Sequence, residues 1–152
     1  TDPVVLITPI AHPWARRGTI EPEELREGVF IMREPGSGTI ATVYDGLAGV
    51  GVSANELETL LVLGNPEAIA LAVHEGLGVG FVSTIVVDKL VRDGVAVVGV
   101  RGLRLERDIY IGRYAHRPVT GAQAAFWEFA REKAIHYGHP ENGFNALEES
   151  YV

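Results

Sequence analysis

The stretch "VFIMREPGSGTI", residues 29–40, passes from an apolar run through Pro-Gly-Ser-Gly into a helical pattern. The run at 29–33 has the continuous apolar character of a buried strand. After the turn, apolar side chains recur at the spacing of one face of a helix: Ile40, Val43, Tyr44 and Leu47. The stretch therefore predicts a strand, a tight turn and a helix in succession, the unit from which α/β folds are built.

The same alternation continues on both sides of this unit. Apolar runs predict strands at 4–7, 59–63, 79–82 and 95–100, and an extended segment at 105–114. Capping signals and helical spacing predict helices at 23–27, 66–75, 84–92 and 120–136, whereas 9–18 is expected to be a loop. The signals include Asn65 as an N-cap before Pro66 at the first helical position, and a capping box formed by Thr120 and Gln123. Because unbroken apolar strands alternate with helices, we expect an α/β fold with a mostly parallel open sheet and helices on both faces.

Composition excludes several classes of function. With 152 residues, 47% of them apolar, the chain is long enough to bury a sizeable core. A net charge of -7 argues against this chain gripping a phosphate backbone by itself. The absence of cysteine removes disulfides and thiol chemistry and fits a reducing, cytoplasmic compartment. No apolar run approaches the roughly 18 residues that a membrane span needs.

The candidate catalytic and metal-binding motifs do not match the residue patterns that those functions require. No lysine follows Gly38, so the turn is not a P-loop, and Gly76-Leu-Gly78-Val-Gly80 precedes a strand instead of following one. Ser37 lacks the G-x-S-x-G setting and has no evident histidine base. His136 and His139 flank a Tyr-Gly loop and do not form a convincing metal pair. We therefore expect no enzyme activity, no metal and no cofactor.

Ligands of open α/β sheets lie beyond the carboxyl ends of the strands. Three predicted strand-to-helix junctions meet this description: 34–39, 64–66 and 82–84. In the first, amides around Gly38 and Thr39 would point out of the positive end of a helix, which favours a carboxylate, phosphate or sulfate. The same residues are equally compatible with a plain tight turn in which Ser37 caps the helix.

The order of several motifs then resembles a known family. "HPWA" at 12–15, "REPGSGT" at 33–39, "NPEAIALAVHEGLGVGFVS" at 65–83, "DKLVRDGVAVVGV" at 88–100 and "AFWEFARE" at 125–132 together resemble the effector-binding domain of LysR-type transcriptional regulators. The resemblance covers roughly residues 3–134. It implies a fold similar to type 2 periplasmic binding proteins, with two α/β lobes, two crossover strands and a small effector between the lobes.

The resemblance also implies a division of the chain. Residues 1–103 would form the second lobe with the first crossover strand, 104–137 the return crossover and the last helix of lobe one, and 138–152 an irregular tail. In the family, a winged helix-turn-helix that binds DNA and the first half of lobe one come earlier in the chain. We therefore expect this sequence to begin inside a longer protein, with one wall of the cleft missing.

Carried over residue by residue, the effector-binding positions are those of the three junctions: Arg33, Glu34, Pro35, Gly36, Ser37, Gly38, Thr39, Gly64, Asn65, Val82, Ser83 and Thr84. Arg33 could bind a carboxylate bidentately or could pair with Glu34 or Asp45. Thr8 and Pro9 would lie at the hinge.

The expected function is non-enzymatic sensing of a small, anionic effector, which modulates transcription by the full-length regulator. The alternative is a solute-binding protein of a transporter, which shares the fold. A transferase or dehydratase on this scaffold is disfavoured because the loops offer no base or nucleophile. The apolar face of helix 120–136, with Phe126 and Phe129, would lack a sheet beneath it and should find another surface. Folding back on this chain's own sheet would meet that need, but we expect self-association into a dimer or a higher oligomer.

Overall fold

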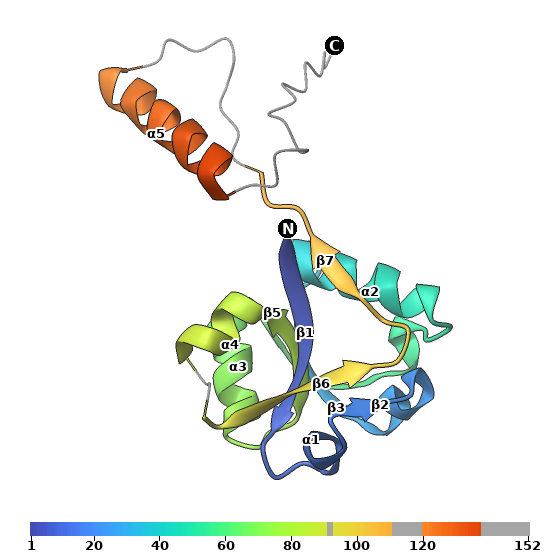
Figure 1. The fold of residues 1–152 in the computed structure, drawn as a ribbon. Coiled ribbons are helices and arrows are strands. Elements are labelled where there is room, and N and C mark those ends of the chain that lie inside the picture. The colour runs from blue at the N-terminus through green and yellow to red at the C-terminus, as the bar shows by residue number, and fades with distance from the viewer. Residues whose placement is uncertain (91–92, 111–119, 138–152) are drawn as a thin grey trace. The chain divides into compact units, whose positions relative to one another are not determined.

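The computed structural model describes residues 1–90, 93–110 and 120–137. The chain divides into two units, Thr1–Tyr110 and Ile111–Val152 (Figure 1). The first unit holds the whole sheet, and the described part of the second is the helix α5 (Gly121–Tyr137). Of the predicted segments, positions 91–92, 111–114 and the tail 138–152 lie outside the described residues.

The first unit is built on a mixed sheet with strand order β2-β6-β1-β5-β3-β4, in which β7 also pairs with β1. Its strands are β1 (Asp2–Pro9), β2 (Thr19–Ile20), β3 (Val29–Arg33), β4 (Glu58–Leu63), β5 (Val79–Ser83), β6 (Val95–Val100) and β7 (Leu105–Arg107). β3 runs parallel to β4 and β5, and β2 runs parallel to β6. β1 runs antiparallel to β5, β6 and β7. The predicted α/β class is confirmed, and the antiparallel character comes from β1 alone.

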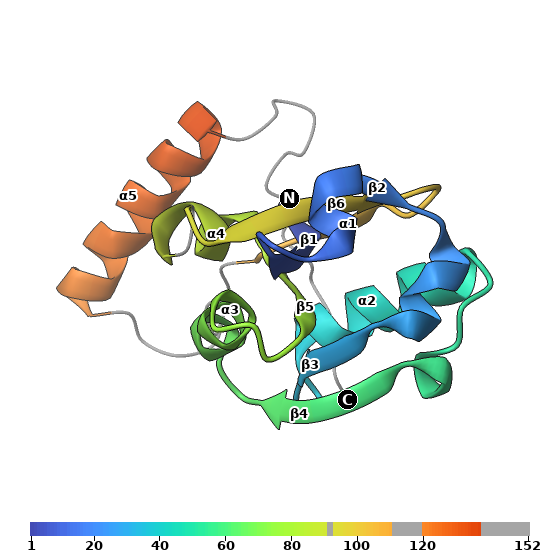
Figure 2. The same ribbon diagram turned by 90° about the horizontal axis from the view of Figure 1, so that it is seen from below.

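Helices cover both faces of this sheet. They are α1 (Pro13–Arg17), the 3-10 helices η1 (Pro22–Glu27) and η2 (Ala54–Glu56), α2 (Gly38–Gly49), α3 (Pro66–His74) and α4 (Thr84–Leu90). Figure 2 shows α1 and α2 on one side of the sheet and α3 and α4 on the other. Two separate apolar clusters confirm this arrangement, one beneath α1 and α2 and the other beneath α3 and α4.

Alternate strand residues supply the two clusters. In β3, Phe30 points into the cluster beneath α2, while its neighbour Ile31 points into the cluster beneath α3. The rings of Phe30 and Phe81 stack with centroids 5.9 Å apart. Burial of such a side chain contributes about 1.5–3 kcal/mol to folding, so these clusters hold the strand ends of the first unit in place.

The segment 9–18, predicted to be a loop, contains helix α1. Pro13 occupies the first helical position, and the backbone N–H of Trp14 donates to His12 Nδ1 at 3.2 Å. Trp14 is 4% exposed and anchors this short helix in the core. Its burial explains why five residues form a helix that has little stability of its own.

Strand β4 departs from the expectation that the strands are covered on both faces. Leu60, Leu61 and Val62 are 52%, 40% and 55% exposed although they form an apolar run. Among the described strands, β4 is the last of the sheet and pairs only with β3, so neither its edge nor its faces are fully covered there. The apolar run was wrong as an indicator of burial here.

Helix α5 begins as predicted. Gln123 N–H donates to Thr120 Oγ1 at 3.4 Å, and Thr120 N–H donates to Gln123 Oε1 at 3.1 Å, which is the expected capping box. Phe126 and Phe129 are 59% and 56% exposed. Two large apolar side chains on one helix therefore remain largely in contact with solvent.

Candidate functional site

The three predicted junctions share one end of the sheet. β3, β4 and β5 are parallel neighbours, with Arg33 opposite Leu63 in the β3–β4 pair. Each of these strands leads directly into a helix, so β3 is followed by α2, β4 by α3 and β5 by α4. The carboxyl ends of parallel strands collect loops and helix N-termini, which makes this edge the candidate ligand site.

The junction between β3 and α2 has an open entrance. Gly36 has φ = 90°, a left-handed conformation that favours glycine, and the exposed Pro35 precedes it in the turn. Ser37 N–H donates to the carbonyl of Glu34 at 3.2 Å and closes the turn. A Cβ added at Gly38 would meet no atom within 4 Å. The Cβ side of Gly38 therefore faces open space, and the first N–H groups of α2 have no acceptor within their own helix.

Ser37 occupies the N-cap position of α2, but its side chain makes no capping hydrogen bond. The predicted capping role is wrong for the hydroxyl. Ser37 is nevertheless only 8% exposed. Among the residues that the structure describes, no fully buried side-chain oxygen or nitrogen lacks a partner, so this hydroxyl retains contact with solvent. It is a free polar group at the entrance of the helix.

The junction between β4 and α3 has a local structural role. Asn65 Oδ1 accepts hydrogen bonds from the N–H groups of Glu67 at 2.8 Å and Ala68 at 3.0 Å. Pro66 follows at the first helical position, as predicted. Because the Asn65 oxygen is used by its own helix, the side-chain amide and the exposed Gly64 are what this junction can offer a ligand.

The junction between β5 and α4 is buried. Val82 is fully buried in the cluster beneath α3 and α4, so only its backbone can face a ligand. Ser83 Oγ donates to Asp2 Oδ1 at 2.5 Å and accepts from Ile85 N–H at 3.2 Å. Thr84 is half-buried at the start of α4. The hydroxyl of Ser83 thus joins this junction to strand β1.

Arg33 is bound by its neighbour. Its Nε and Nη2 donate to the two carboxylate oxygens of Glu34 at 2.8 and 2.9 Å. This hydrogen bonding raises the pKa of Arg33 and lowers the pKa of Glu34. The pairing with Glu34, the second of the two roles considered for Arg33, is therefore the one that the structure contains.

Sequence reasoning missed Arg107 and Asp2. They lie opposite each other in the β1–β7 pair, and Arg107 Nε donates to Asp2 Oδ2 at 2.7 Å. Arg107 Nη1 also donates to Thr39 Oγ1 at 2.8 Å. Asp2 and Thr39 are 2% and 3% exposed. The ion pair connects β1, β7 and the entrance of α2. Its two residues are 105 positions apart, so local sequence patterns do not predict this contact.

The hinge positions are internal to the sheet. Thr8 is fully buried in β1, and its Oγ1 donates to the carbonyl of Pro9 at 3.2 Å. Nothing in these contacts directs the Thr8 hydroxyl toward the junctions described above.

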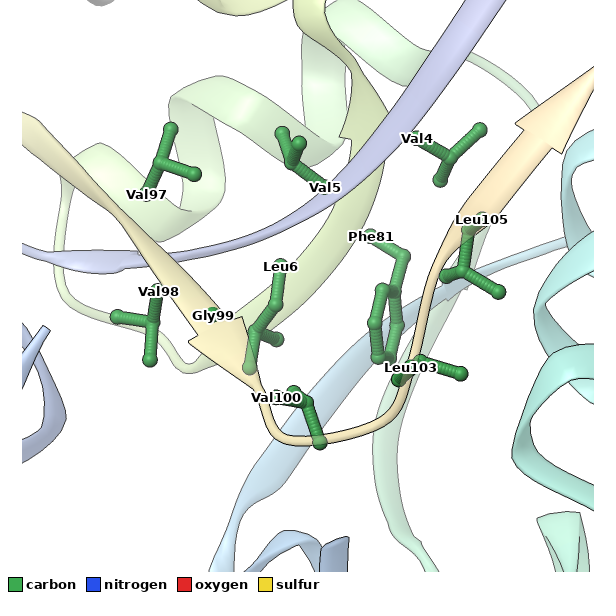
Figure 3. A pocket seen from close by; sticks show the side chains of 10 residues that line it. All are labelled: Val4, Val5, Leu6, Phe81, Val97, Val98, Gly99, Val100, Leu103 and Leu105. Carbon is green, nitrogen blue, oxygen red and sulfur yellow. The ribbon is translucent and has the colours of Figure 1, made fainter. Parts of the chain in front are cut away.

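A small apolar cavity of about 120 Å³ lies elsewhere in the first unit, where β6 leaves β1 and the chain turns into β7. Figure 3 shows the residues that line it, whose side chains carry no polar atom: Val4, Val5, Leu6, Phe81, Val97, Val98, Gly99, Val100, Leu103 and Leu105. None of the predicted effector-binding residues lines it. It offers a ligand no side-chain hydrogen bond, in contrast to the strand-end site.

Within residues 1–90, 93–110 and 120–137, no three His, Cys, Asp or Glu side chains gather as a metal ion would require. Over the same residues, no helix is both long and apolar enough to cross a membrane.

The sequence matches the family model described as the LysR substrate binding domain over residues 1–135. It is 36% identical over 129 residues to an uncharacterized HTH-type transcriptional regulator of Methanocaldococcus jannaschii, covering 84% of this chain and 44% of that protein. It is 33% identical over 129 residues to the RuBisCO operon transcriptional regulator of Acidithiobacillus ferrooxidans, covering 84% of this chain and 41% of that protein. The chain thus spans less than half the length of these relatives.

Solved structures show the same fold. The regulatory domain of CcmR from Synechocystis PCC6803, in complex with 2-PG, superposes with a TM-score of 0.67 at 26% identity, covering 84% of this chain and 61% of that one. The effector-binding domain of QuiR, in complex with shikimate, superposes with a TM-score of 0.77 at 18% identity, covering 90% of this chain and 64% of that one.

Proposed function

The chain belongs to the LysR substrate binding domain family, and from that premise we propose that it is the effector-sensing domain of a bacterial LysR-type transcriptional regulator. It is a domain of a regulator and not an enzyme. Its fold is that of LysR effector-binding domains, similar to periplasmic binding proteins. The full-length regulator, including its helix-turn-helix, belongs to the proposal.

The proposed effector is a small anionic molecule bound at the carboxyl ends of β3, β4 and β5. The observation that carries this proposal is the entrance of α2, where the space beside Gly38 is open and the hydroxyl of the mostly buried Ser37 has no partner among the described residues. Such an entrance offers donors and a positive helix end, which suit an acidic group. Of the similar solved structures, the CcmR domain was solved with 2-PG and the QuiR domain with shikimate, which carries a carboxylate.

Effector binding acts through the arrangement of the lobes. The first unit supplies one wall of the cleft, and the first half of lobe one in the full-length protein supplies the other. A ligand that binds the closed form more tightly shifts the population toward closure by its differential affinity. Closure then changes the arrangement in which an oligomer of regulators binds DNA in the cytoplasm. The effector domain itself is acidic and makes no contact with the DNA.

Two exposed apolar surfaces are available for self-association. The outer strand β4 leaves Leu60 and Val62 more than half exposed, and α5 leaves Phe126 and Phe129 in the same condition. An unpaired edge strand with apolar side chains pairs or packs readily with another chain. We propose a dimer or a higher oligomer in which α5 contributes buried area.

A titration tests the effector site. Small organic acids, including shikimate, are screened against the 152-residue chain by isothermal titration calorimetry, and each binder is titrated again into Thr39→Val. Loss of the buried Thr39 hydroxyl should weaken binding about tenfold, because Arg107 Nη1 loses the acceptor that holds it at the entrance of α2. Thr59→Val on the exposed strand β4 is the matched control and should bind normally. Equal binding by all three proteins would place the effector elsewhere.

The sequence of the full-length gene distinguishes this proposal from the alternative, a solute-binding protein of a transporter. A helix-turn-helix encoded before Thr1 identifies a regulator, whereas a secretory signal sequence in that position identifies a transport protein.

A further inference from the structure

Arg107 lies at the centre of a polar cluster that connects two of the three junctions. Its guanidinium contacts Asp2 Oδ2 through Nε and Nη2, each at 2.7 Å, and Thr39 Oγ1 through Nη1 at 2.8 Å. The other oxygen of Asp2 accepts from Ser83 at 2.5 Å. The cluster therefore runs from the entrance of α2, through the ion pair, to the end of β5.

Arg107 has hydrogen-bonding capacity left over. A guanidinium carries five N–H donors. Among the described residues, the contacts to Asp2 and Thr39 occupy three of these donors, which leaves two. The Arg107 side chain is 30% exposed, whereas Asp2 is 2% exposed. The charged group that reaches solvent from this cluster is thus the cation, while the anion is held inside.

A second free group lies two residues from the bonded Thr39. Ser37 is 8% exposed, its hydroxyl has no partner among the described residues, and that hydroxyl still reaches solvent. A hydroxyl that reaches solvent without a protein partner can hydrogen-bond to water or to a ligand. The N–H groups of the first turn of α2 add further donors. The open positions of this site are therefore hydrogen-bond donors with one cation among them.

We propose that Arg107 is a specificity-determining residue that binds the acidic group of the effector, and that Asp2 positions its guanidinium for this contact. The inference rests on the proposed effector site and names the residue that selects for charge there. Asp2 lowers the net charge of the cluster, so the site suits a ligand with a single acidic group better than one with several. Ser83 fixes the Asp2 carboxylate from the opposite side.

Inorganic phosphate is the probe, titrated into the uniformly ¹⁵N-labelled 152-residue chain and followed by NMR. Phosphate should shift the amides of Gly38 and Thr39 and the Nε–H signal of Arg107. Arg107→Gln should weaken binding about tenfold or more, because a charge-assisted contact is lost. Asp2→Asn keeps a side-chain oxygen that can accept from the guanidinium and hold its position, but removes the nearby negative charge, so it should strengthen binding several-fold. A purely structural role for the pair would weaken binding in both variants.

Two further variants keep the test decisive. Arg107→Gln leaves a buried carboxylate without its cation and risks unfolding the chain. The Asp2→Asn variant is therefore compared with the double variant Asp2→Asn/Arg107→Gln. These two proteins differ from each other only at residue 107. Arg104→Gln, at an exposed arginine paired with Glu106, measures the general effect of removing one positive charge. The role of Arg107 is overturned if phosphate binds at Gly38 and Thr39 equally well in the Asp2→Asn variant and in the double variant. It is also overturned if Arg104→Gln weakens this binding as much as the loss of Arg107 does. Either outcome leaves the proposed effector site in place. Phosphate shifts that avoid Gly38 and Thr39 in the wild-type chain overturn both.

Discussion

The hydroxyl of Ser83 donates a 2.5 Å hydrogen bond to the carboxylate of Asp2, which lies 81 positions earlier in the chain and is 2% exposed. This contact joins the first strand of the unit to the point where β5 becomes α4. A buried carboxylate is costly unless its oxygens accept hydrogen bonds, so this bond contributes to the stability of the fold as well as to the site.

Ser83→Ala should therefore lower the free energy of unfolding by about 1–3 kcal/mol, the cost of leaving a buried charged acceptor short of a donor. Thr42→Ala is the control, since the Thr42 hydroxyl donates to the carbonyl of Gly38 at 3.0 Å on the solvent side of α2. Urea unfolding followed by circular dichroism measures both variants. A Ser83→Ala loss no larger than that of Thr42→Ala would show that water replaces the Ser83 hydroxyl.

Gly28→Ala should destabilise the fold by overpacking. A Cβ at position 28 would lie 2.7 Å from Trp14 Cη2 and 2.9 Å from Phe30 Cε2, and both rings are buried in the same cluster. Overpacking of this kind costs about 1–3 kcal/mol. Gly38→Ala is the matched control, because its Cβ would meet no atom within 4 Å. Thermal unfolding should show a lower midpoint for the first variant only, and equal midpoints would contradict the packing described for Trp14.

Acid should weaken the contact between α1 and η1. The hydrogen bonds that Arg17 donates lower the pKa of Glu24 from 4.5 to about 2. Because the folded-state pKa lies below the unfolded value, this contribution to stability is complete above pH 4.5 and is lost as the pH falls through about 2. The difference in unfolding free energy between wild type and Glu24→Gln should shrink over that range. Arg17→Gln should show the same convergence, and a constant offset in either variant would refute the coupling.

Association should depend on α5. Phe126→Asp combined with Phe129→Asp should convert a dimer into a monomer, because charges on a helix face oppose its burial against another chain. Static light scattering at high micromolar concentration measures the mass. Leu60→Asp combined with Val62→Asp on β4 is the comparison, and a dimer broken only by that pair would move the interface to the sheet edge. A wild-type monomer would contradict self-association of this chain altogether.

The 152-residue chain should not bind DNA. Its net charge of -7 gives little means of neutralising phosphates, and binding to duplexes depends on that neutralisation. A mobility-shift assay at low salt should show only free duplex. A retained complex whose affinity falls steeply with added salt would reveal a basic surface on this chain.

Elements with local signals could be predicted from the sequence. β3 begins and ends at the predicted residues, Asn65 caps α3 as expected, and Thr120 and Gln123 form their capping box. Each depends on side chains a few positions apart, where propensity and capping chemistry act. Helix α1 was missed although His12 and Pro13 carried a start signal, because its stability comes from burying Trp14 in a distant core.

The candidate site could be predicted only in part. The junction residues follow from strand ends and turns, which are local, whereas the ion pair of Asp2 and Arg107 depends on strand pairing across 105 positions. The exposure of Leu60 and Val62 was missed for a related reason. An apolar run predicts a strand, but the position of that strand within the sheet is a property of the whole fold.

The position of β1 in the sheet has a consequence for how the chain folds. It precedes the other strands of the unit in the chain, yet its sheet partners β5, β6 and β7 all begin at Val79 or later. Loop closure over such separations costs entropy before any contact compensates for it, so β1 should join late and slow the folding of the unit. The segment from β3 to β5 can assemble first from shorter loops. Until β1 inserts, the apolar edge of β5 is open, and in that interval the nascent chain is most exposed to aggregation.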